Sequence, residues 1–181
     1  MVKSAYSFAT KKEKQEQHII VVWVDNEAGV LARVVGLFSG RGYNIDSLAV
    51  AEVDKKKNIS RITIATSGTQ QVLQQIRLQL GKLVPVHKVA DFPSNKKTLI
   101  REMALLKIVS SKTNLEKSKK LCKKYQATVV DYTSKSIVLE ISAQKKEIDQ
   151  LIKKLQPLGL ASISRTGVVA MTKGSEVYKQ I

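Results

Sequence analysis

Residues 24–45 read VDNEAGVLARVVGLFSGRGYNI, and this segment is the strongest indication of the chain's architecture. An apolar run ends at Val24, a polar turn carries Asn26 and Gly29, and apolar residues then recur at the spacing of one helix face. A strand, turn and helix in this order direct backbone N–H groups toward a small anion, such as the carboxylate of an amino acid. A Gly-rich turn and a second amide, Asn44, follow the helix. Because no nucleophile, metal cluster or acid/base pair accompanies it, the stretch predicts small-molecule binding and not catalysis.

Composition limits the class of protein. The 181 residues suffice for one large or two small domains, and 43% apolar content supports a core built mainly from aliphatic side chains, since aromatic residues make up only 5%. The one cysteine excludes an internal disulfide and suits a reducing compartment. Neither a membrane-length apolar run nor the apolar core of a secretory signal is present, so we expect a soluble protein with no membrane partner.

The net charge of +16 needs an explanation, and most of it comes from lysine. Residues 1–95 contribute +5 and residues 96–181 contribute +11, with 25 Lys against 6 Arg in the whole chain. Nucleic-acid binding is one reading. Arginine, the preferred residue for bidentate phosphate recognition, is rare here, so a solvated Lys-rich surface is favoured. An acidic partner protein would also suit the charge.

The first half of the chain predicts one small α+β domain. Residues 1–17 have no apolar period and are interpreted as a flexible extension. Residues 18–92 have the order βαββαβ, which is that of a ferredoxin-like fold with the second and fourth strands at the sheet edges. Pro85 cannot donate a ladder hydrogen bond, which agrees with an edge position for the fourth strand. The expected strands are 18–24, 44–53, 59–66 and 83–89, and the expected helices are 29–41 and 69–80.

The second half repeats this plan after a linker at 93–99, which contains Pro93 and Asn95. Residues 100–181 then predict a second α+β domain, so the fold class is α+β with two ferredoxin-like βαββαβ domains, each with two helices on one face of its sheet. The second domain has no counterpart of the turn at 26–29. Its expected strands are 103–109, 128–132, 137–142 and 160–171 (the last a strand or a hairpin), and its expected helices are 113–125 and 144–156.

Other reactive residues are better explained structurally. Cys122 has the helical spacing of a core-facing side chain, and His18 and His87 belong to no metal-ligand pattern. Asp25 and Glu27 flank the key turn, where they either contact a substrate ammonium group or complement the helix start. The glycines at 39–42 follow a helix, which is the wrong order for a nucleotide loop. The strand at 59–66 lacks the aromatic residues of an RNA-recognition module, so no nucleic-acid partner is expected.

Six segments together closely resemble the small, regulatory subunit of acetolactate synthase (acetohydroxyacid synthase). The resemblance is colinear and covers roughly residues 18–178, and the stretch from 24 to 48 is specific to this subunit. A generic ACT domain would share only the Gly29 turn and the fold. The segments are VDNEAGVL at 24–31, RVVGLFSGRGYNIDSL at 33–48, SRITI at 60–64, QLGKLV at 79–84, REMALLK at 101–107 and SRTGVVAM at 164–171.

The resemblance implies an effector-binding ACT domain at 18–92 and the C-terminal α+β domain of the small subunit at 100–181. Such a subunit is not an enzyme by itself. It binds the large catalytic subunit, which carries thiamine diphosphate, Mg and FAD, raises its activity and confers feedback inhibition by valine. The holoenzyme condenses two pyruvates, or pyruvate with 2-oxobutyrate, in branched-chain amino-acid biosynthesis. Pro85 and the N-terminal extension are unusual for the family.

The residues and the resemblance together give an expected effector site. The effector carboxylate would accept N–H bonds from Gly29 and Val30, two amides would complete the polar shells, and small apolar side chains would hold the branched side chain. We expect the site to lie between the ACT domains of a homodimer, because exposed sheet edges readily pair across a dimer axis. The expected effector-binding residues are Asn26, Ala28, Gly29, Val30, Asn44 and Ile45.

Two other functional classes stay open from the sequence alone. One is a free-standing ACT-domain regulator that binds an amino acid, and the other is a stand-alone enzyme. Lysine richness and the lack of a long transit segment fit a bacterial cytoplasm or a protein encoded within a plastid, and we expect the chloroplast stroma.

Overall fold

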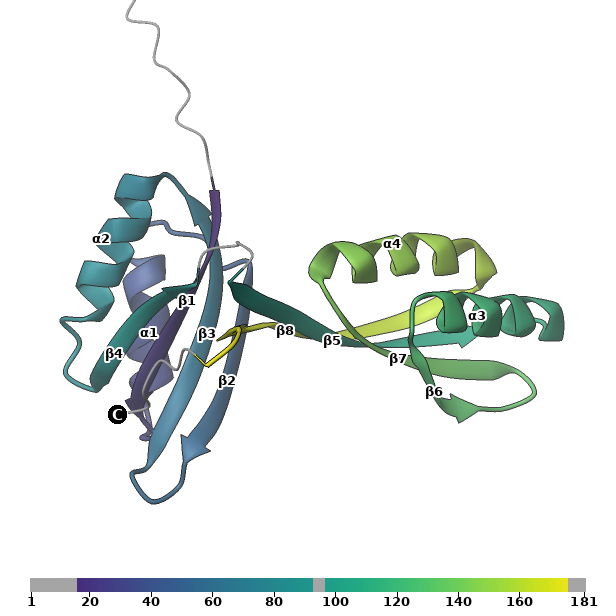
Figure 1. Cartoon of the computed structure of the whole chain (residues 1–181), viewed down its shortest axis with the longest axis horizontal. Helices are drawn as coiled ribbons and strands as arrows, with labels where there is room; N and C mark the ends of the chain where they lie inside the picture. The colour runs from purple at the N-terminus through teal and green to yellow at the C-terminus, as the bar shows by residue number, and fades with distance from the viewer. Residues whose placement is uncertain (1–15, 93–96, 176–181) are drawn as a thin grey trace, which may run out of the picture.

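The computed structural model describes residues 16–92 and 97–175. They form two four-stranded antiparallel sheets, each with two helices on one face, so the expected α+β class with two βαββαβ domains is confirmed (Figure 1). The first strand begins at Glu16, inside the extension expected at 1–17, and residues 1–15 lie outside the described residues.

The N-terminal domain has the strand order β2-β3-β1-β4, which places the second and fourth strands at the edges as expected. β1 is central and pairs antiparallel with both β3 and β4. The elements of this domain are β1 (Glu16–Asp25), α1 (Val30–Ser39), β2 (Ser47–Asp54), β3 (Ile59–Gly68), α2 (Gln70–Leu80) and β4 (Val86–Phe92).

The core of the N-terminal domain forms because β1 is buried on both faces. Every side chain from Ile19 to Val24 is at most 5% exposed. Ile20 and Val22 face the two helices, whereas Val21 and Trp23 belong to a separate cluster on the helix-free face. The helices complete the first cluster with apolar residues three or four positions apart. These are Val30, Val34, Leu37 and Phe38 of α1, and Leu73, Ile76 and Leu80 of α2.

Pro85 does not lie within the fourth strand. It belongs to the turn before β4, which begins at Val86, and its carbonyl oxygen accepts a hydrogen bond from the N–H of Asp25 at 3.0 Å. The edge position of β4 is therefore correct, but the reason given for it from the sequence is wrong, because Pro85 occupies no ladder position.

The C-terminal domain has the equivalent order, β6-β7-β5-β8. β5 begins at Thr98, so the last two residues of the linker expected at 93–99 are strand, and residues 93–96 lie outside the described residues. Leu160–Thr172 forms one long strand and not a hairpin. The elements are β5 (Thr98–Val109), α3 (Lys112–Lys124), β6 (Thr128–Tyr132), β7 (Ser136–Ala143), α4 (Lys145–Leu155), a 3₁₀ turn (Gln156–Leu158) and β8 (Leu160–Thr172).

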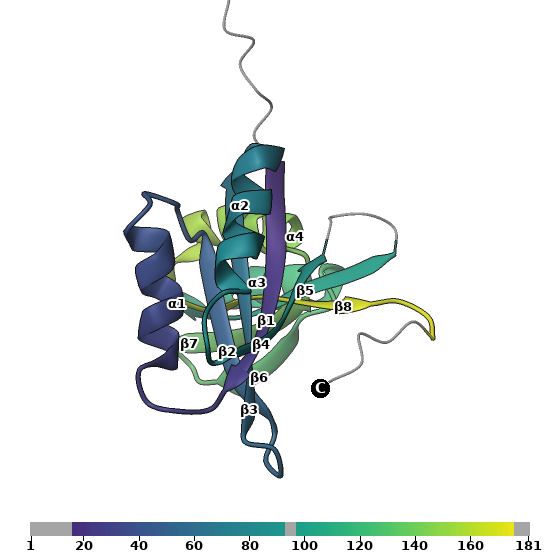
Figure 2. The same cartoon turned by 90° about the vertical axis from the view of Figure 1, so that its left-hand side faces the viewer.

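The two domains share a core, because β5 and β8 extend beyond their own helices. Their far ends lie against the helix-free face of the N-terminal sheet (Figures 1 and 2). Val168 and Ala170 of β8 are buried there together with Trp23 and other residues of the first sheet. The N–H of Val168 also donates to the hydroxyl oxygen of Ser47 at 3.3 Å. The N-terminal sheet is thus the middle layer of the molecule.

Candidate functional site

The turn between β1 and α1 depends on Gly29, whose φ of 84° and ψ of −10° lie in the left-handed region. A Cβ there would meet no atom within 4 Å, so the backbone angle and not crowding within the chain favours glycine. The N–H of Val30 has only a long contact, 3.4 Å, to the carbonyl oxygen of Glu27. The first turn of α1 contains no acidic side chain, and Gly29 has none for capping, so this helix start offers partial positive charge to an anion.

Asn26 joins this turn to the start of β3. Its N–H donates to the carbonyl oxygen of Asn58 at 2.8 Å, and the side-chain amide of Asn58 donates back to the carbonyl oxygen of Asn26 at 3.2 Å. The hydroxyl of Ser60 donates to the side-chain oxygen of Asn26 at 3.0 Å. Asn26 and Ala28 are both exposed. The structure therefore fixes Asn26 as part of the turn and leaves the surface around it open.

Asn44 lies in a second polar cluster. It precedes β2 by three residues, so the strand expected at 44–53 begins later than predicted. Its side-chain amide donates to a carboxylate oxygen of Asp46 at 2.7 Å, and its backbone carbonyl oxygen accepts from the hydroxyl of Thr66 at 2.6 Å. The hydroxyl of Ser67 donates to the other oxygen of Asp46 at 2.8 Å. Ile45 is partly buried against the core beneath the helices.

One chain does not bring these two groups together. Asn26 contacts Ser60 near the start of β3, whereas Asn44 contacts Thr66 near its end. Ser60 and Thr66 are six positions apart along the strand, which corresponds to about 20 Å at the usual rise of a strand. The ten residues of α1 lie between the two groups as well. A ligand the size of an amino acid cannot reach both groups within a single copy.

The best-formed cavities of the surface are consistent with this conclusion. Four cavities of about 340–410 Å³ are formed by described residues. None of the six residues expected to bind the effector lines any of these four. Each of the two groups is therefore an exposed half of a possible site and not a closed pocket.

The remaining reactive side chains have local partners. The thiol of Cys122 is buried and donates to the carbonyl oxygen of Ala127 at 2.8 Å, and burial raises the pKa of this thiol, so it is not an activated nucleophile. His87 contacts Asp25 at 2.6 Å, which explains Asp25 without a substrate ammonium group. His18 contacts Asp91 at 3.1 Å. Residues 16–92 and 97–175 contain no group of three or more His, Cys, Asp or Glu side chains placed to hold a metal ion.

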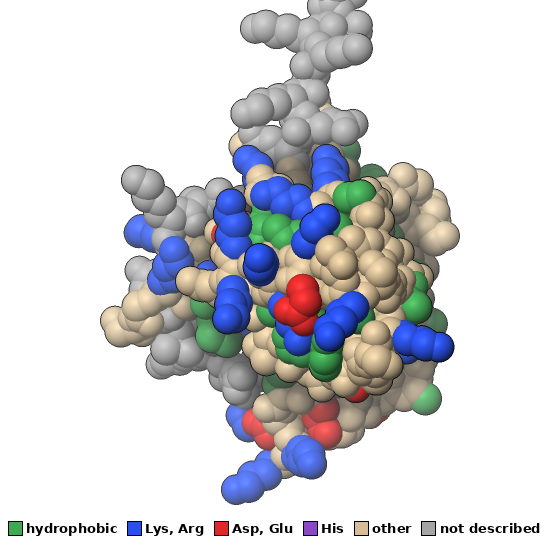
Figure 3. Space-filling view, turned by 90° about the vertical axis from the view of Figure 1, so that its right-hand side faces the viewer, with side chains coloured by type: hydrophobic (Ala, Val, Ile, Leu, Met, Phe, Trp, Pro, Cys, Tyr) green, Lys and Arg blue, Asp and Glu red, His purple; other side chains and the backbone are tan. Residues whose placement is uncertain are grey.

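The lysine excess is visible at the end of the C-terminal domain. Figure 3 shows Lys and Arg side chains spread over this face with few acidic ones among them. The lysines at 123, 124, 145, 146, 153 and 154 are exposed on α3 and α4. They are dispersed between uncharged and apolar surface, as expected for a solvated face.

Two features of the structure were missed from the sequence. One is the contact of β8 with the N-terminal sheet, where Gly167 (φ 79°) lies against Ser47, so that a Cβ at 167 would come within 3.2 Å of the Ser47 Cβ. The other is Arg61, which reaches β8 beneath the sheet. The sequence feature that indicated both was the continuous apolar run at 19–24, because a strand buried on both faces must be covered on each of them.

Comparisons with known proteins agree with this architecture. Residues 20–88 match the family model of the AHAS small subunit-like ACT domain, and residues 101–174 match that of the small subunit of acetolactate synthase. The acetolactate synthase small subunits of Haemophilus influenzae and Bacillus subtilis are 37% and 36% identical to the chain. Each alignment covers 88% of this chain, and 98% and 92% of the respective relative.

A solved structure extends the likeness to three dimensions. The acetolactate synthase small subunit from Thermotoga maritima superposes with a TM-score of 0.81 at 30% identity, covering 89% of this chain and 99% of that one. Among the described residues, no helix is both long and apolar enough to cross a membrane. With both family models matched in order along one chain, this protein belongs to the acetolactate synthase small-subunit family.

Proposed function

We propose that this chain is the regulatory, non-catalytic subunit of an acetolactate synthase, raising the activity of a large catalytic subunit and making it sensitive to valine. The observation that carries the proposal is the turn at Gly29, with its left-handed backbone and its uncapped helix start. The family membership supports it, since the relatives reported above are small subunits of that enzyme. The holoenzyme would act in branched-chain amino-acid biosynthesis.

The turn supplies the chemistry for binding an amino acid by its carboxylate. The N–H groups of Gly29 and Val30 stand at the positive end of the α1 dipole, where a carboxylate is stabilised. Valine has a short branched side chain, which Ala28 and Ile45 would contact. The side-chain oxygen of Asn44 is a suitable acceptor for the ammonium group, because the amide nitrogen of Asn44 is already used by Asp46.

We propose that the site is completed by a second copy of the chain. Within one copy, the β3 residues that Asn26 and Asn44 contact are about 20 Å apart. In a homodimer of ACT domains, the Gly29 turn of one copy would face Asn44 and Ile45 of the other. Valine would then stabilise one packing of the dimer over another.

A chain of contacts links this site to the C-terminal domain. Asp46 binds Asn44 and Ser67, and the next residue, Ser47, accepts the N–H of Val168 and lies against Gly167 of β8. A ligand that moves Asn44 would therefore act on the junction of the domains. We expect a coupling free energy of about 1–3 kcal/mol between valine binding and the catalytic subunit.

The remaining parts of the proposal concern the holoenzyme. Thiamine diphosphate, Mg and FAD would be held by the large subunit and not by this chain, and the condensation of 2-oxo acids would take place there. No nucleic-acid partner is proposed. The assembly would work in a bacterial cytoplasm or in a plastid stroma.

The test uses the full chain reconstituted with an acetolactate synthase large subunit. Gly29→Asp and Asn44→Ala should each abolish valine inhibition, because one places a carboxylate where the ligand carboxylate binds and the other removes a polar group. Both variants should still stimulate the large subunit. Gly174→Asp is the matched control, since Gly174 also has a positive φ and open space around it but lies far along the chain. Acetolactate formation is measured with and without valine.

A mixture of the two variants tests the two-copy site. In a mixed dimer, one interface site combines the intact Gly29 turn of one copy with the intact Asn44 of the other, so part of the valine sensitivity should return. Full sensitivity in both single variants would refute the site. A chain that neither binds nor stimulates the large subunit would instead favour a free-standing amino-acid-binding regulator.

A further inference from the structure

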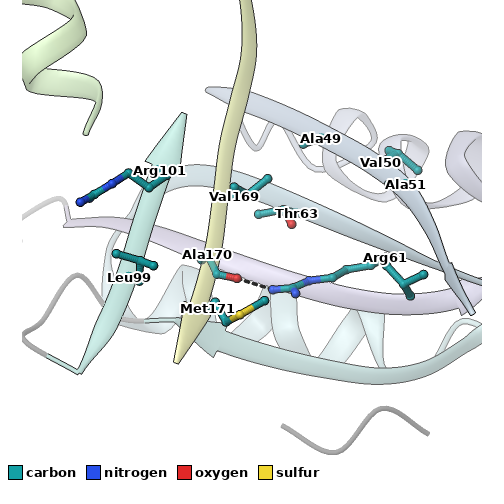
Figure 4. A pocket seen from close by; sticks show the side chains of 11 residues that line it. Ala49, Val50, Ala51, Arg61, Thr63, Leu99, Arg101, Val169, Ala170 and Met171 are labelled. Atoms are coloured by element: carbon teal, nitrogen blue, oxygen red, sulfur yellow. Dashed lines mark hydrogen bonds between the residues drawn. The ribbon is translucent and has the colours of Figure 1, made fainter. Parts of the chain in front are cut away.

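The cavity that the proposed effector site does not use lies between the two domains. It has a volume of about 360 Å³ and opens beneath the edge of the N-terminal sheet, where β2 and β3 face the ends of β5 and β8 (Figure 4). Its walls are mainly aliphatic and come from both domains. Ala49, Ala51, Val169 and Met171 are among them. Val169 and Met171 are 50% and 59% exposed, so apolar surface is left open to solvent here.

Arg61 brings a cation into this apolar setting. Its guanidinium donates from Nη2 to the carbonyl oxygen of Ala170 and lies 5.4 Å from the ring centre of Trp23 and 5.7 Å from that of Phe92. Its Nε is buried without a hydrogen-bond partner. No described carboxylate forms an ion pair with it, and burial lowers the pKa of this guanidinium. A partly buried cation without a counter-anion is costly, and an anion beside it would offset that cost.

The other residues that line the cavity determine which class of anion fits beside Arg61. Arg101 also borders the cavity, but Figure 4 shows its side chain directed away from Arg61, and it donates to the carbonyl oxygen of Ile100 at 3.0 Å. The lining contains no Asp or Glu. An α-ammonium group would therefore stand near Arg61 with no carboxylate to bind it, so the cavity disfavours zwitterionic amino acids.

We propose that this interdomain cavity binds a monocarboxylate with an apolar chain, with Arg61 holding the carboxylate and the aliphatic walls holding the chain. Arginine suits this role because its free guanidinium edge matches the geometry of a carboxylate. The hydrocarbon would cover the exposed parts of Val169 and Met171, which joins β8 more firmly to β2. The inference does not depend on the Gly29 site, since the two sites share no residue.

A purely structural role for Arg61 makes a different prediction. As a clamp between the domains, Arg61 would need only the carbonyl oxygen of Ala170 and the two aromatic rings. Arg61 would then bind no free anion. A side chain that fills the cavity would therefore change neither the calorimetric signal nor the Trp23 fluorescence in a titration with a carboxylate. A binding experiment separates the two roles, because Trp23 is the chain's single tryptophan and its ring lies beside Arg61.

The experiment titrates the full chain carrying Gly29→Asp, which blocks the proposed effector site, with octanoate and with 4-methyl-2-oxopentanoate. Calorimetry and Trp23 fluorescence are followed together, and leucine is the zwitterionic control with the same branched skeleton as the oxo acid. Both acids should bind with a concurrent fluorescence change, and leucine should bind at least about tenfold more weakly, because its ammonium group has no partner. The better binder of the two acids reports the chain length that the cavity accepts.

Three variants locate the binding. Arg61→Gln should weaken it by about tenfold or more through loss of the charge-assisted bonds, whereas Arg101→Gln, the matched control, should change it less than about twofold. Ala51→Leu should abolish binding by filling the cavity while keeping Arg61 and the interdomain bond. Because Arg61→Gln can also loosen the interface, the Ala51→Leu result keeps the proposal open to refutation.

The proposal is overturned if neither acid binds at millimolar concentration, if leucine binds equally well, or if Ala51→Leu leaves the affinity unchanged. If a second copy of the chain closes the cavity, neither acid should bind. Valine inhibition of the reconstituted enzyme is measured separately on the Ala51→Leu chain and should persist. Failure of the cavity proposal therefore does not affect the proposed regulatory function. Loss of the proposed regulatory function would likewise not affect the cavity proposal.

Discussion

The two sheets of this chain have equivalent strand orders but are covered differently. In the N-terminal sheet, β1 is buried on both faces, with helices on one side and the ends of β5 and β8 on the other. In the C-terminal sheet, β5 alternates, so that Ala104, Leu106 and Ile108 are buried beneath the helices while Leu105 and Lys107 face away. A repeated topology thus serves as a middle layer in one half and as an outer layer in the other.

The sequences of the two central strands predict this difference in burial. Residues 19–24 are continuously apolar, whereas residues 104–109 include Lys107 on the uncovered face. A continuous run reports burial on two faces and an alternating run reports burial on one. Where two halves of a chain share a topology, this pattern indicates which of the two sheets is covered on both faces, with the other domain packed against one of them.

The largest expected effect comes from a comparison of two residues, one on the helix-free face of each sheet. Trp23→Ala should lower the free energy of unfolding by about 3–5 kcal/mol, because it empties a site packed between the domains. Leu105→Ala, on the same face of the C-terminal sheet, should cost about 1 kcal/mol, since Leu105 is already partly exposed. Chemical denaturation followed by circular dichroism gives both values.

Trp23→Phe is the conservative control and should lose less than Trp23→Ala, because a phenyl ring keeps part of the contact beneath β8. Similar losses for Trp23→Ala and Leu105→Ala would contradict the comparison. They would mean that the N-terminal sheet is not held as a middle layer in solution.

A smaller effect is expected at two glycines that share a backbone conformation but differ in surroundings. Gly159→Ala places a Cβ 2.6 Å from the carbonyl oxygen of Val109, so strain at φ 97° is joined by a collision with backbone. Gly29→Ala meets nothing within 4 Å and should cost only the left-handed strain, about 1–2 kcal/mol. Gly159→Ala should therefore unfold at the lower denaturant concentration. The reverse ranking would show that the Gly29 turn is packed more tightly than one copy of the chain indicates.

Much of the fold could be predicted because local pattern and tertiary burial agree. The apolar spacing of α1 and α2 matches the residues they bury, and α1 ends at Ser39, two residues before the end expected at 41. Pro85 shows the limit of such reasoning, since strand ends shift by a few residues and a proline placed in a strand turned out to precede it.

The arrangement of the candidate site could be predicted only in part. The sequence identifies the Gly29 turn because a left-handed residue before a helix needs glycine, and it identifies Asn44 through the family resemblance. It does not show that these residues lie at opposite ends of α1, because a sequence motif gives the order of residues and not the distance between them in space. Arg61 was missed because its neighbours are remote in sequence. Trp23 is its partner on the adjacent strand of the N-terminal sheet, and Ala170 meets it only across the domain interface.

The smallest effect should come from the N-termini of two equivalent helices, α2 and α4, each of which follows the third strand of its domain. In α2 the hydroxyl of Thr69 accepts from the N–H of Val72 at 3.4 Å, and in α4 the carboxylate of Glu147 accepts from the N–H of Gln144 at 3.0 Å. Thr69→Ala and Glu147→Ala should each cost about 0.5–1 kcal/mol, with the shorter, charge-assisted bond of Glu147 giving the larger loss. Glu147→Gln keeps an acceptor without the charge and should fall between Glu147→Ala and the unchanged chain. The measurement is the shift in denaturant midpoint at constant slope. A loss from Thr69→Ala as large as that from Trp23→Ala would mean that the stability of the middle layer depends on a helix cap and not on its two covered faces.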